Sequence, residues 1–183
     1  AFDLHQNKSI RERISTLATD ANATIVLGTL QWLPDYTAYG QKRYDVAAVF
    51  SSEGEFDSYA SKYPLPFEIP ATEGKHDETF SLDYNKRFRT ILCFEETVRK
   101  QYKKAKQNNA DFIVALSNNL HFTEHKMALK IVSQYTKLYA AEFGIPVIRS
   151  TNTGTTQIID EKGKVVSQLE ENEEGILIGN ILV

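Results

Sequence analysis

The chain has little of several features that would assign it to a specialised class of protein. It contains one cysteine in 183 residues, so an internal disulfide framework is excluded. No apolar run approaches the roughly 20 residues that a membrane-spanning helix needs. The formal net charge is −3, so no large basic face is implied and nucleic acid is not an expected partner. A glycine-rich phosphate-binding loop is also missing.

The start of the chain, Ala1 to Leu4, has neither the basic nor the apolar region of a secretory signal peptide. We expect this abrupt start to mark a fragment or a processed chain. The composition is 42% hydrophobic and 25% charged, which is typical of a soluble globular chain with a sizeable core. The length favours one domain, so we expect residues 1–183 to form a single domain.

Apolar periodicity predicts an α/β chain with a strand-rich end. Helices are expected over residues 8–21, 95–109 and 123–143. Strands are expected over residues 24–31, 44–51, 56–60, 80–83, 88–93, 111–116, 146–149, 155–160, 165–169 and 175–181. The proline-rich stretch over residues 61–78 is expected to be a long loop, and loops of that length in compact domains are usually functional or disordered.

The single cysteine, Cys93, ends a short apolar strand and precedes a charged, helix-forming stretch. A turn of this kind lifts a thiol out of a sheet, and the N–H groups at the helix start favour a thiolate and any neighbouring oxyanion. This segment alone leaves two interpretations open. Cys93 is either a reactive nucleophile or a buried structural cysteine, since free cysteine is among the most buried residue types.

Polar groups also gather in three other places. Lys62 lies in the proline-rich loop, and polar runs at residues 117–119 and 149–154 follow two predicted strands. In open α/β sheets, ligand sites collect at the carboxyl ends of strands. The four histidines include one pair at near-helical spacing, with no third ligand in sight, so we expect neither a metal nor a cofactor.

Taken in order, these segments resemble the carbon–nitrogen hydrolase (nitrilase) superfamily. The matching blocks are the hairpin at 44–59, the lysine loop, ILCFE at 91–95, LSNN at 116–119 and PVIRSTNTG at 146–154. The last block is followed by IIDEKGKV at 158–165 and is more similar to the extracytoplasmic domain of bacterial apolipoprotein N-acyltransferases than to soluble amidases. The resemblance runs over nearly the whole chain.

This resemblance implies a nitrilase-like four-layer α-β-β-α sandwich, here N-terminally incomplete because its first strand and helix are missing. It implies an acyltransferase that takes a fatty acyl chain from a phospholipid as a cysteine thioester. The acceptor would be the N-terminal amine of a diacylated apolipoprotein. The implied location is the bacterial inner membrane, with the domain facing the periplasm and the membrane-spanning segments absent from this chain.

The resemblance also implies roles for individual residues. In the family's Glu–Lys–Cys triad, Cys93 matches the nucleophile and Lys62 the lysine, whose ammonium can stabilise an oxyanion. The N–H of Phe94 is the other oxyanion donor. Glu95 resembles a supporting glutamate two residues after the nucleophile, and Glu68 resembles another, although its spacing from the lysine is shorter than usual. The general-base glutamate is expected upstream, so little activity is expected from this chain alone.

Four residues are candidates for binding substrate, namely Asn118, His121, Arg149 and Asn152. His121 is otherwise a surface histidine, and Arg149 and Asn152 could equally hold their loop by hydrogen bonds. Two other readings of the chain stay open, a soluble amidase or nitrilase with water as the acceptor and a truncated or degenerate domain without turnover. Because a missing first strand would expose a sheet edge, self-association is also expected.

Overall fold

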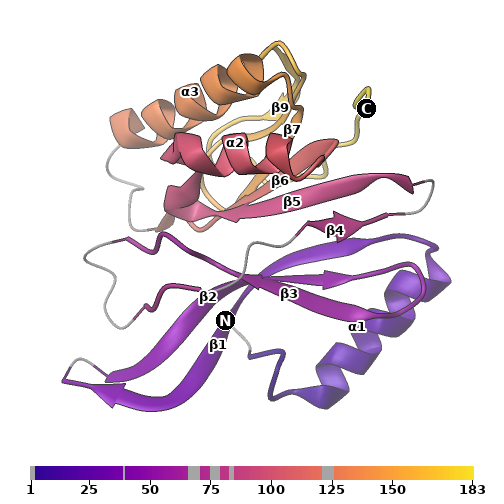
Figure 1. Cartoon of the computed structure of the whole chain (residues 1–183), viewed down its shortest axis with the longest axis vertical. Coiled ribbons are helices and arrows are strands. Elements are labelled where there is room, and N and C mark those ends of the chain that lie inside the picture. The colour runs from indigo at the N-terminus through magenta and orange to yellow at the C-terminus, as the bar shows by residue number, and fades with distance from the viewer. Residues whose placement is uncertain (1–2, 39, 66–70, 75–78, 83–84, 121–125) are drawn as a thin grey trace. The chain divides into compact units, whose positions relative to one another are not determined.

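The structure is a computed structural model that describes residues 3–38, 40–65, 71–74, 79–82, 85–120 and 126–183 (Figure 1). The chain divides into two compact units, Ala1–Glu78 and Thr79–Val183. Each unit combines a β-sheet with helices, so the predicted α/β class is confirmed. None of the helices formed by the described residues is both long and apolar enough to cross a bilayer.

The first unit is a three-stranded antiparallel sheet with one helix packed on it. The strand order is β1-β2-β3, with β1 (Ile25–Thr37), β2 (Gly40–Phe50) and β3 (Phe56–Ala60). Helix α1 (Lys8–Asp20) begins after Asn7, whose side-chain oxygen accepts the Ile10 N–H at 3.1 Å. Its apolar side covers the sheet in a cluster that contains Leu4, Ala18, Ala48 and Phe50.

The second unit is a six-stranded mixed sheet in the order β4-β5-β6-β7-β8-β9. Its central strands β5, β6 and β7 are mutually parallel, and the outer strands pair antiparallel. The strands are β4 (Phe80–Ser81), β5 (Arg87–Leu92), β6 (Phe112–Ser117), β7 (Val147–Thr151), β8 (Thr156–Ile159) and β9 (Val165–Leu169). Their helices are η2 (Cys93–Thr97), α2 (Arg99–Gln107) and α3 (Lys126–Phe143).

Helices α2 and α3 cover one face of this second sheet (Figure 1). Their contact includes the rings of Tyr102 and Tyr139, whose centroids lie 5.1 Å apart. Beneath them a buried apolar cluster includes Ile91, Ile113 and Val147 from the three parallel strands. Because parallel strands end at the same edge of a sheet, this packing brings the residues that follow β5, β6 and β7 together.

The helix expected over residues 95–109 is interrupted. A 3₁₀ turn occupies Cys93–Thr97, Val98 is extended with φ −94° and ψ 95°, and the α-helix begins at Arg99. The cause is that the side chains of Glu95 and Glu96 are fully buried and bonded inside the unit, whereas a continuous surface helix would leave first-turn acidic residues in water.

The strand expected over residues 175–181 is wrong. This segment, which the structure describes throughout, has no strand conformation, and Ile176 and Ile178 are largely exposed. Gly179 lies against the side chains of β8 and β9, since an added Cβ would meet Ile158 Cδ1 at 2.6 Å and Ser167 Oγ at 3.2 Å. A segment that crosses the face of a sheet cannot join its ladder of backbone hydrogen bonds.

Candidate functional site

Cys93 lies where β5 ends and the chain turns into η2. Its φ is +49°, a left-handed conformation that costs an L residue about 1–2 kcal/mol. Strain of this kind gathers at functional sites when the surroundings over-determine it. The Cys93 thiol is half-buried, and its Sγ lies 3.9 Å from the carbonyl oxygen of Asn118. The thiol therefore points to the edge where β5 and β6 both end.

Two exposed asparagines from neighbouring strand ends are joined at this edge. Asn152 donates from Nδ2 to Asn118 Oδ1 at 2.7 Å, and its own Oδ1 accepts the Asn119 N–H at 2.8 Å. The Asn118 Oδ1 also accepts the Leu120 N–H at 3.2 Å. These bonds fix the loops after β6 and β7 beside the thiol and leave amide groups facing solvent. The binding roles of Asn118 and Asn152 stay predictions.

Glu95 supports the turn from inside. Its carboxylate is fully buried, and it accepts the Leu92 N–H at 2.8 Å and the Gln101 amide at 2.6 Å. Gln101 in turn accepts a hydrogen bond from Arg89 Nη2 at 2.8 Å. The charge of Glu95 therefore lies directly behind the backbone that carries the thiol, and a chain of hydrogen bonds ties it to β5 and α2.

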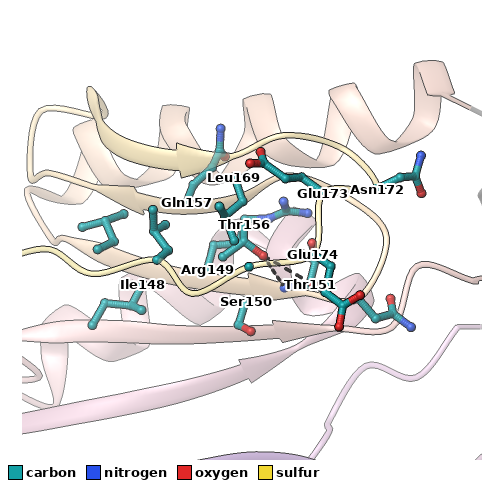
Figure 2. Close-up of a pocket in the computed structure, with 14 residues that line it drawn as sticks. Ile148, Arg149, Ser150, Thr151, Thr156, Gln157, Leu169, Asn172, Glu173 and Glu174 are labelled. Atoms are coloured by element: carbon teal, nitrogen blue, oxygen red, sulfur yellow. Dashed lines mark hydrogen bonds between the residues drawn. The ribbon is translucent and has the colours of Figure 1, made fainter.

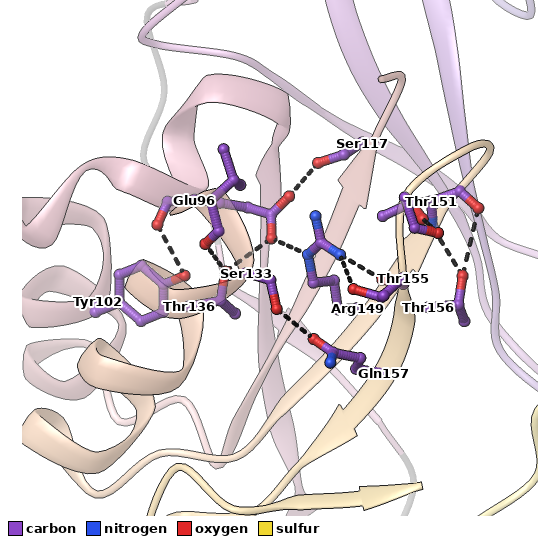
Figure 3. A network of polar contacts seen from close by, with 12 residues as sticks. Glu96, Tyr102, Ser117, Ser133, Thr136, Arg149, Thr151, Thr155, Thr156 and Gln157 are labelled. Carbon is purple, nitrogen blue, oxygen red and sulfur yellow. Dashed lines mark hydrogen bonds and ion pairs between the residues drawn. The ribbon is translucent and has the colours of Figure 1, made fainter. Parts of the chain in front are cut away.

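Glu96 forms a buried ion pair with Arg149 (Figure 3). The Arg149 Nε donates to Glu96 Oε2 at 2.5 Å, and both side chains are at most 1% exposed. The same carboxylate accepts the hydroxyls of Ser117 and Thr136, the second at 2.9 Å. One carboxylate thus ties the turn after Cys93 to β6, α3 and β7.

Further hydrogen bonds surround this pair. The Tyr102 hydroxyl donates to the Glu96 backbone carbonyl at 3.2 Å, and Arg149 Nη1 donates to the Thr155 carbonyl. Burial, together with the charge of Glu96, raises the pKa of Tyr102 well above its usual value. Gly154 is confined as well, because a Cβ there would meet Asn119 Nδ2 at 2.8 Å.

A separate cavity of about 580 Å³ lies between β7, β8 and residues 172–177 (Figure 2). Arg149, Thr151 and Asn152 line it together with Glu173 and Glu174. Cys93 does not line this cavity. The position of this cavity therefore does not show where the thiol would act. Asn152 lines the cavity and also belongs to the strand-end edge at which the thiol lies.

The other predicted site residues lie in different places. Phe94 follows the thiol and is partly exposed. Lys62 is half-buried just after β3, in a loop where the Gly74 N–H donates to the Ser61 carbonyl at 2.6 Å. Because Lys62 and Cys93 belong to different units, their proximity stays a prediction. Glu68 and His121 lie outside the described residues.

Sequence reasoning missed the inward role of Glu96. Acidic residues in the first turn of an expected helix are typically solvated charges, and nothing in the local sequence indicates that Glu96, three residues after the cysteine, points inward. The partner, Arg149, is 53 residues away, and no local pattern connects the two. Among the described residues, no three His, Cys, Asp or Glu side chains gather as a metal-binding set, and the absence of a metal stays a prediction.

The carbon–nitrogen hydrolase family model matches residues 3–182. Curated relatives include the apolipoprotein N-acyltransferase of Vibrio cholerae, 29% identical over 152 residues, which are 77% of this chain and 30% of the relative. The corresponding protein of Photobacterium profundum is 25% identical over 193 residues, covering 93% of this chain and 37% of the relative. The chain therefore spans about a third of the length of these relatives.

Solved structures share the fold. A carbon–nitrogen hydrolase from Helicobacter pylori superposes with a TM-score of 0.75 at 13% identity, over 91% of this chain and 64% of that one. An amidase from Nesterenkonia sp. AN1, with an acetamide group covalently added at its active-site cysteine, gives 0.71 at 15% identity, over 92% of this chain and 65% of that one. The predicted nitrilase-like α/β fold is confirmed, and the chain belongs to the carbon–nitrogen hydrolase family.

Proposed function

We propose that this chain is the thioester-forming part of an N-acyltransferase with Cys93 as the nucleophile. The observation that carries the proposal is the position of Cys93, strained at φ +49° at the carboxyl end of a parallel strand and directly before a helical turn. The names of the curated relatives favour acyl transfer over hydrolysis.

The proposed reaction has two steps. The Cys93 thiolate attacks the carbonyl carbon of a phospholipid acyl ester, the bond to the glycerol oxygen breaks, and that oxygen takes a proton to leave a lysophospholipid. The N-terminal amine of a diacylated lipoprotein then attacks the thioester. The C–S bond breaks, the amine loses a proton, and an amide and a free thiolate result. The Lys62 ammonium and the Phe94 N–H stabilise the oxyanion in each step.

The proposed supporting roles follow from the contacts. Glu95 and Glu96 hold the turn from behind, because both carboxylates are buried and bonded to neighbouring elements. The exposed amides of Asn118 and Asn152 are placed to receive the substrate. The binding role proposed for Arg149 falls to its Nη2, since Nε donates to Glu96 and Nη1 donates to the Thr155 carbonyl. Glu68 is proposed to have the supporting role, and His121 the substrate-binding role, that the resemblance implies.

We further propose that the intact protein acts at the bacterial inner membrane with this domain on the periplasmic side. The support is the similarity to apolipoprotein N-acyltransferases, whose names specify a lipoprotein acceptor. The general base is proposed to lie outside these residues, so slow turnover by the chain alone agrees with the proposal.

The reactivity of Cys93 tests the first part of the proposal. Alkylation of the thiol by iodoacetamide is followed against pH, and a midpoint clearly below the model thiol value of about 8.5 is expected. Cys93 is the chain's single cysteine, so all labelling reports on this site. A midpoint at or above 8.5 would contradict an activated nucleophile.

Acyl transfer is tested with an activated ester, whose leaving group needs no proton. Incubation with the p-nitrophenyl ester of a fatty acid is expected to add one acyl group per chain, located by mass spectrometry at Cys93 and absent from Cys93→Ala. A diacylated lipopeptide with a free amine should then discharge the thioester faster than water does. Discharge at the same rate with and without the lipopeptide would favour a hydrolase instead.

A further inference from the structure

Helix α3 presents an apolar stripe to solvent. Met127, Ile131, Tyr135 and Leu138 are exposed to 73%, 47%, 39% and 57%, respectively. Their spacing of four, four and three residues places them on one side of the helix. The opposite side contributes Leu129 and Ala140 to the buried interior. The helix is therefore apolar on two sides, and the described part of the chain covers only one of them.

Basic residues border this stripe on both sides. Lys130 and Lys137 lie along one border by their helical spacing. On the other side α2 runs beside α3 (Figure 1), and its Arg99 donates to Glu142, which continues the face of the stripe four residues after Leu138. Helix α2, with the sequence RKQYKKAKQ, has five basic residues and no acidic one. Exposed Lys100 and Lys103 extend this basic side.

The acidic groups of these two helices are few. Within α2 and the described part of α3, Glu142 is the acidic residue, and both of its oxygens accept hydrogen bonds from Arg99. The whole chain carries a net charge of −3, so the positive charge of this layer is local. An apolar stripe between two basic borders is the pattern of helices that lie in a membrane interface.

We propose that the outer face of α2 and α3 docks onto the surface of an anionic lipid bilayer. The apolar stripe would enter the boundary between head groups and acyl chains, and the lysines would reach the phosphates with their ammonium groups. This inference rests on the two helices alone and does not depend on the reaction assigned to Cys93. It gives the second unit a membrane contact of its own.

The charge of this face argues for lipid over other occupants. A second copy of the chain would bring two basic borders together around the stripe, and like charges facing each other oppose association. A nucleic acid would match the lysines but would leave the apolar stripe against polar phosphates. An anionic bilayer satisfies both features, since it offers negative head groups above an apolar interior.

Vesicle co-sedimentation tests the proposal. The chain is expected to bind vesicles of phosphatidylglycerol and phosphatidylcholine, to lose binding as salt rises, and to bind pure phosphatidylcholine weakly. Each lysine near an anionic surface contributes about fivefold in partitioning, so Lys100→Glu with Lys103→Glu should weaken binding at least about 25-fold. Ile131→Ser with Leu138→Ser should weaken it by tenfold or more, on the order of the loss of two half-buried apolar side chains.

Matched controls keep the test specific. Leu17→Ser changes a similarly exposed leucine on α1, and Lys162→Glu with Lys164→Glu reverses two exposed charges in a hairpin turn. Both controls should bind like the unchanged chain, and circular dichroism should show all variants folded. Equal binding by every variant, or no binding at low salt, would overturn the proposal. A change in oligomeric state on sedimentation analysis, with vesicle binding unaltered, would overturn it in favour of a contact between copies.

Discussion

Glu96→Gln is expected to destabilise the protein strongly, although it changes one atom of a side chain that touches no solvent. The substitution removes the charge that faces Arg149 at 2.5 Å and leaves that guanidinium buried and unpaired. It also gives Ser117 or Thr136 an amide donor where each now donates to a carboxylate oxygen. Breaking a buried pair in this way costs about 3–5 kcal/mol.

The expected shift in melting temperature follows from the size of the chain. A change of 1 kcal/mol moves Tm by about 2–4 °C for 150–250 residues, so Glu96→Gln should lower Tm by about 6–20 °C. Differential scanning calorimetry at pH 7 measures this shift. The turn that begins at Cys93 loses its anchor at the same time, so alkylation of the thiol should also change its pH midpoint.

The same unit supplies a matched control. Glu142 also pairs with an arginine, Arg99, through three hydrogen bonds, but that pair is partly exposed. Exposed pairs contribute little because water already solvates both charges, so Glu142→Gln should leave Tm nearly unchanged. A double replacement, Glu96→Leu with Arg149→Met, should recover much of the loss, since neither member of this pair then leaves the other's charge buried without its partner. If Glu96→Gln lowers Tm no more than Glu142→Gln does, the ion pair does not hold the turn.

Three further predictions concern single side chains. Gly154→Ala should lower Tm and slow labelling of the thiol, because the new Cβ would lie 2.8 Å from Asn119 Nδ2. Gly28→Ala is the control and should be tolerated, because its Cβ would meet nothing within 4 Å. Equal melting curves for the two variants would contradict the prediction. Burial lowers the pKa of His5, so the folded state binds its proton less readily than the unfolded one, and stability should fall as pH drops below about 6.5. Urea midpoints at pH 7.5 and 5.5 should differ less for His5→Gln than for the unchanged chain. The raised pKa of Tyr102 means that its hydroxyl should stay protonated until the chain unfolds in alkali. At 295 nm, Tyr102→Phe should therefore leave the phenol ionisation that precedes unfolding unaltered and should remove one phenol from the ionisation that accompanies unfolding.

The arrangement at the strand ends could be predicted from the sequence because it depends on local rules. Apolar runs that end at Cys93, at Leu116 and at Arg149 predict strands, and helices between them predict parallel pairing. Parallel strands end at one edge, so the residues after them must meet there. In agreement with this rule, the Cys93 Sγ lies 3.9 Å from the carbonyl oxygen of Asn118 in the structure.

What could not be predicted depends on contacts between distant residues. The pairing of Glu96 with Arg149 spans 53 positions, and an acidic residue at the start of a charged stretch usually belongs to a solvated helix. The prediction of a strand over residues 175–181 is wrong for the opposite reason, because there the local pattern is present and the pairing with another strand is not. The alternation of Ile176 and Ile178 satisfies the local rule for a strand. The segment nevertheless does not pair with the outermost strand β9, and its Gly179 lies against the side chains of Ile158 and Ser167 on the face of the sheet.

The buried carboxylate of Glu96 also bears on the order in which the second unit folds. Its partners Ser117, Thr136 and Arg149 are 21, 40 and 53 residues distant in the chain. Three loops must close before this group can leave water, and each closure has an entropic cost. We therefore expect its contacts to form after the folding transition state, so that Glu96 substitutions speed unfolding far more than they slow refolding. The edge that carries the thiol would be the last part of the unit to assemble and the first to come apart.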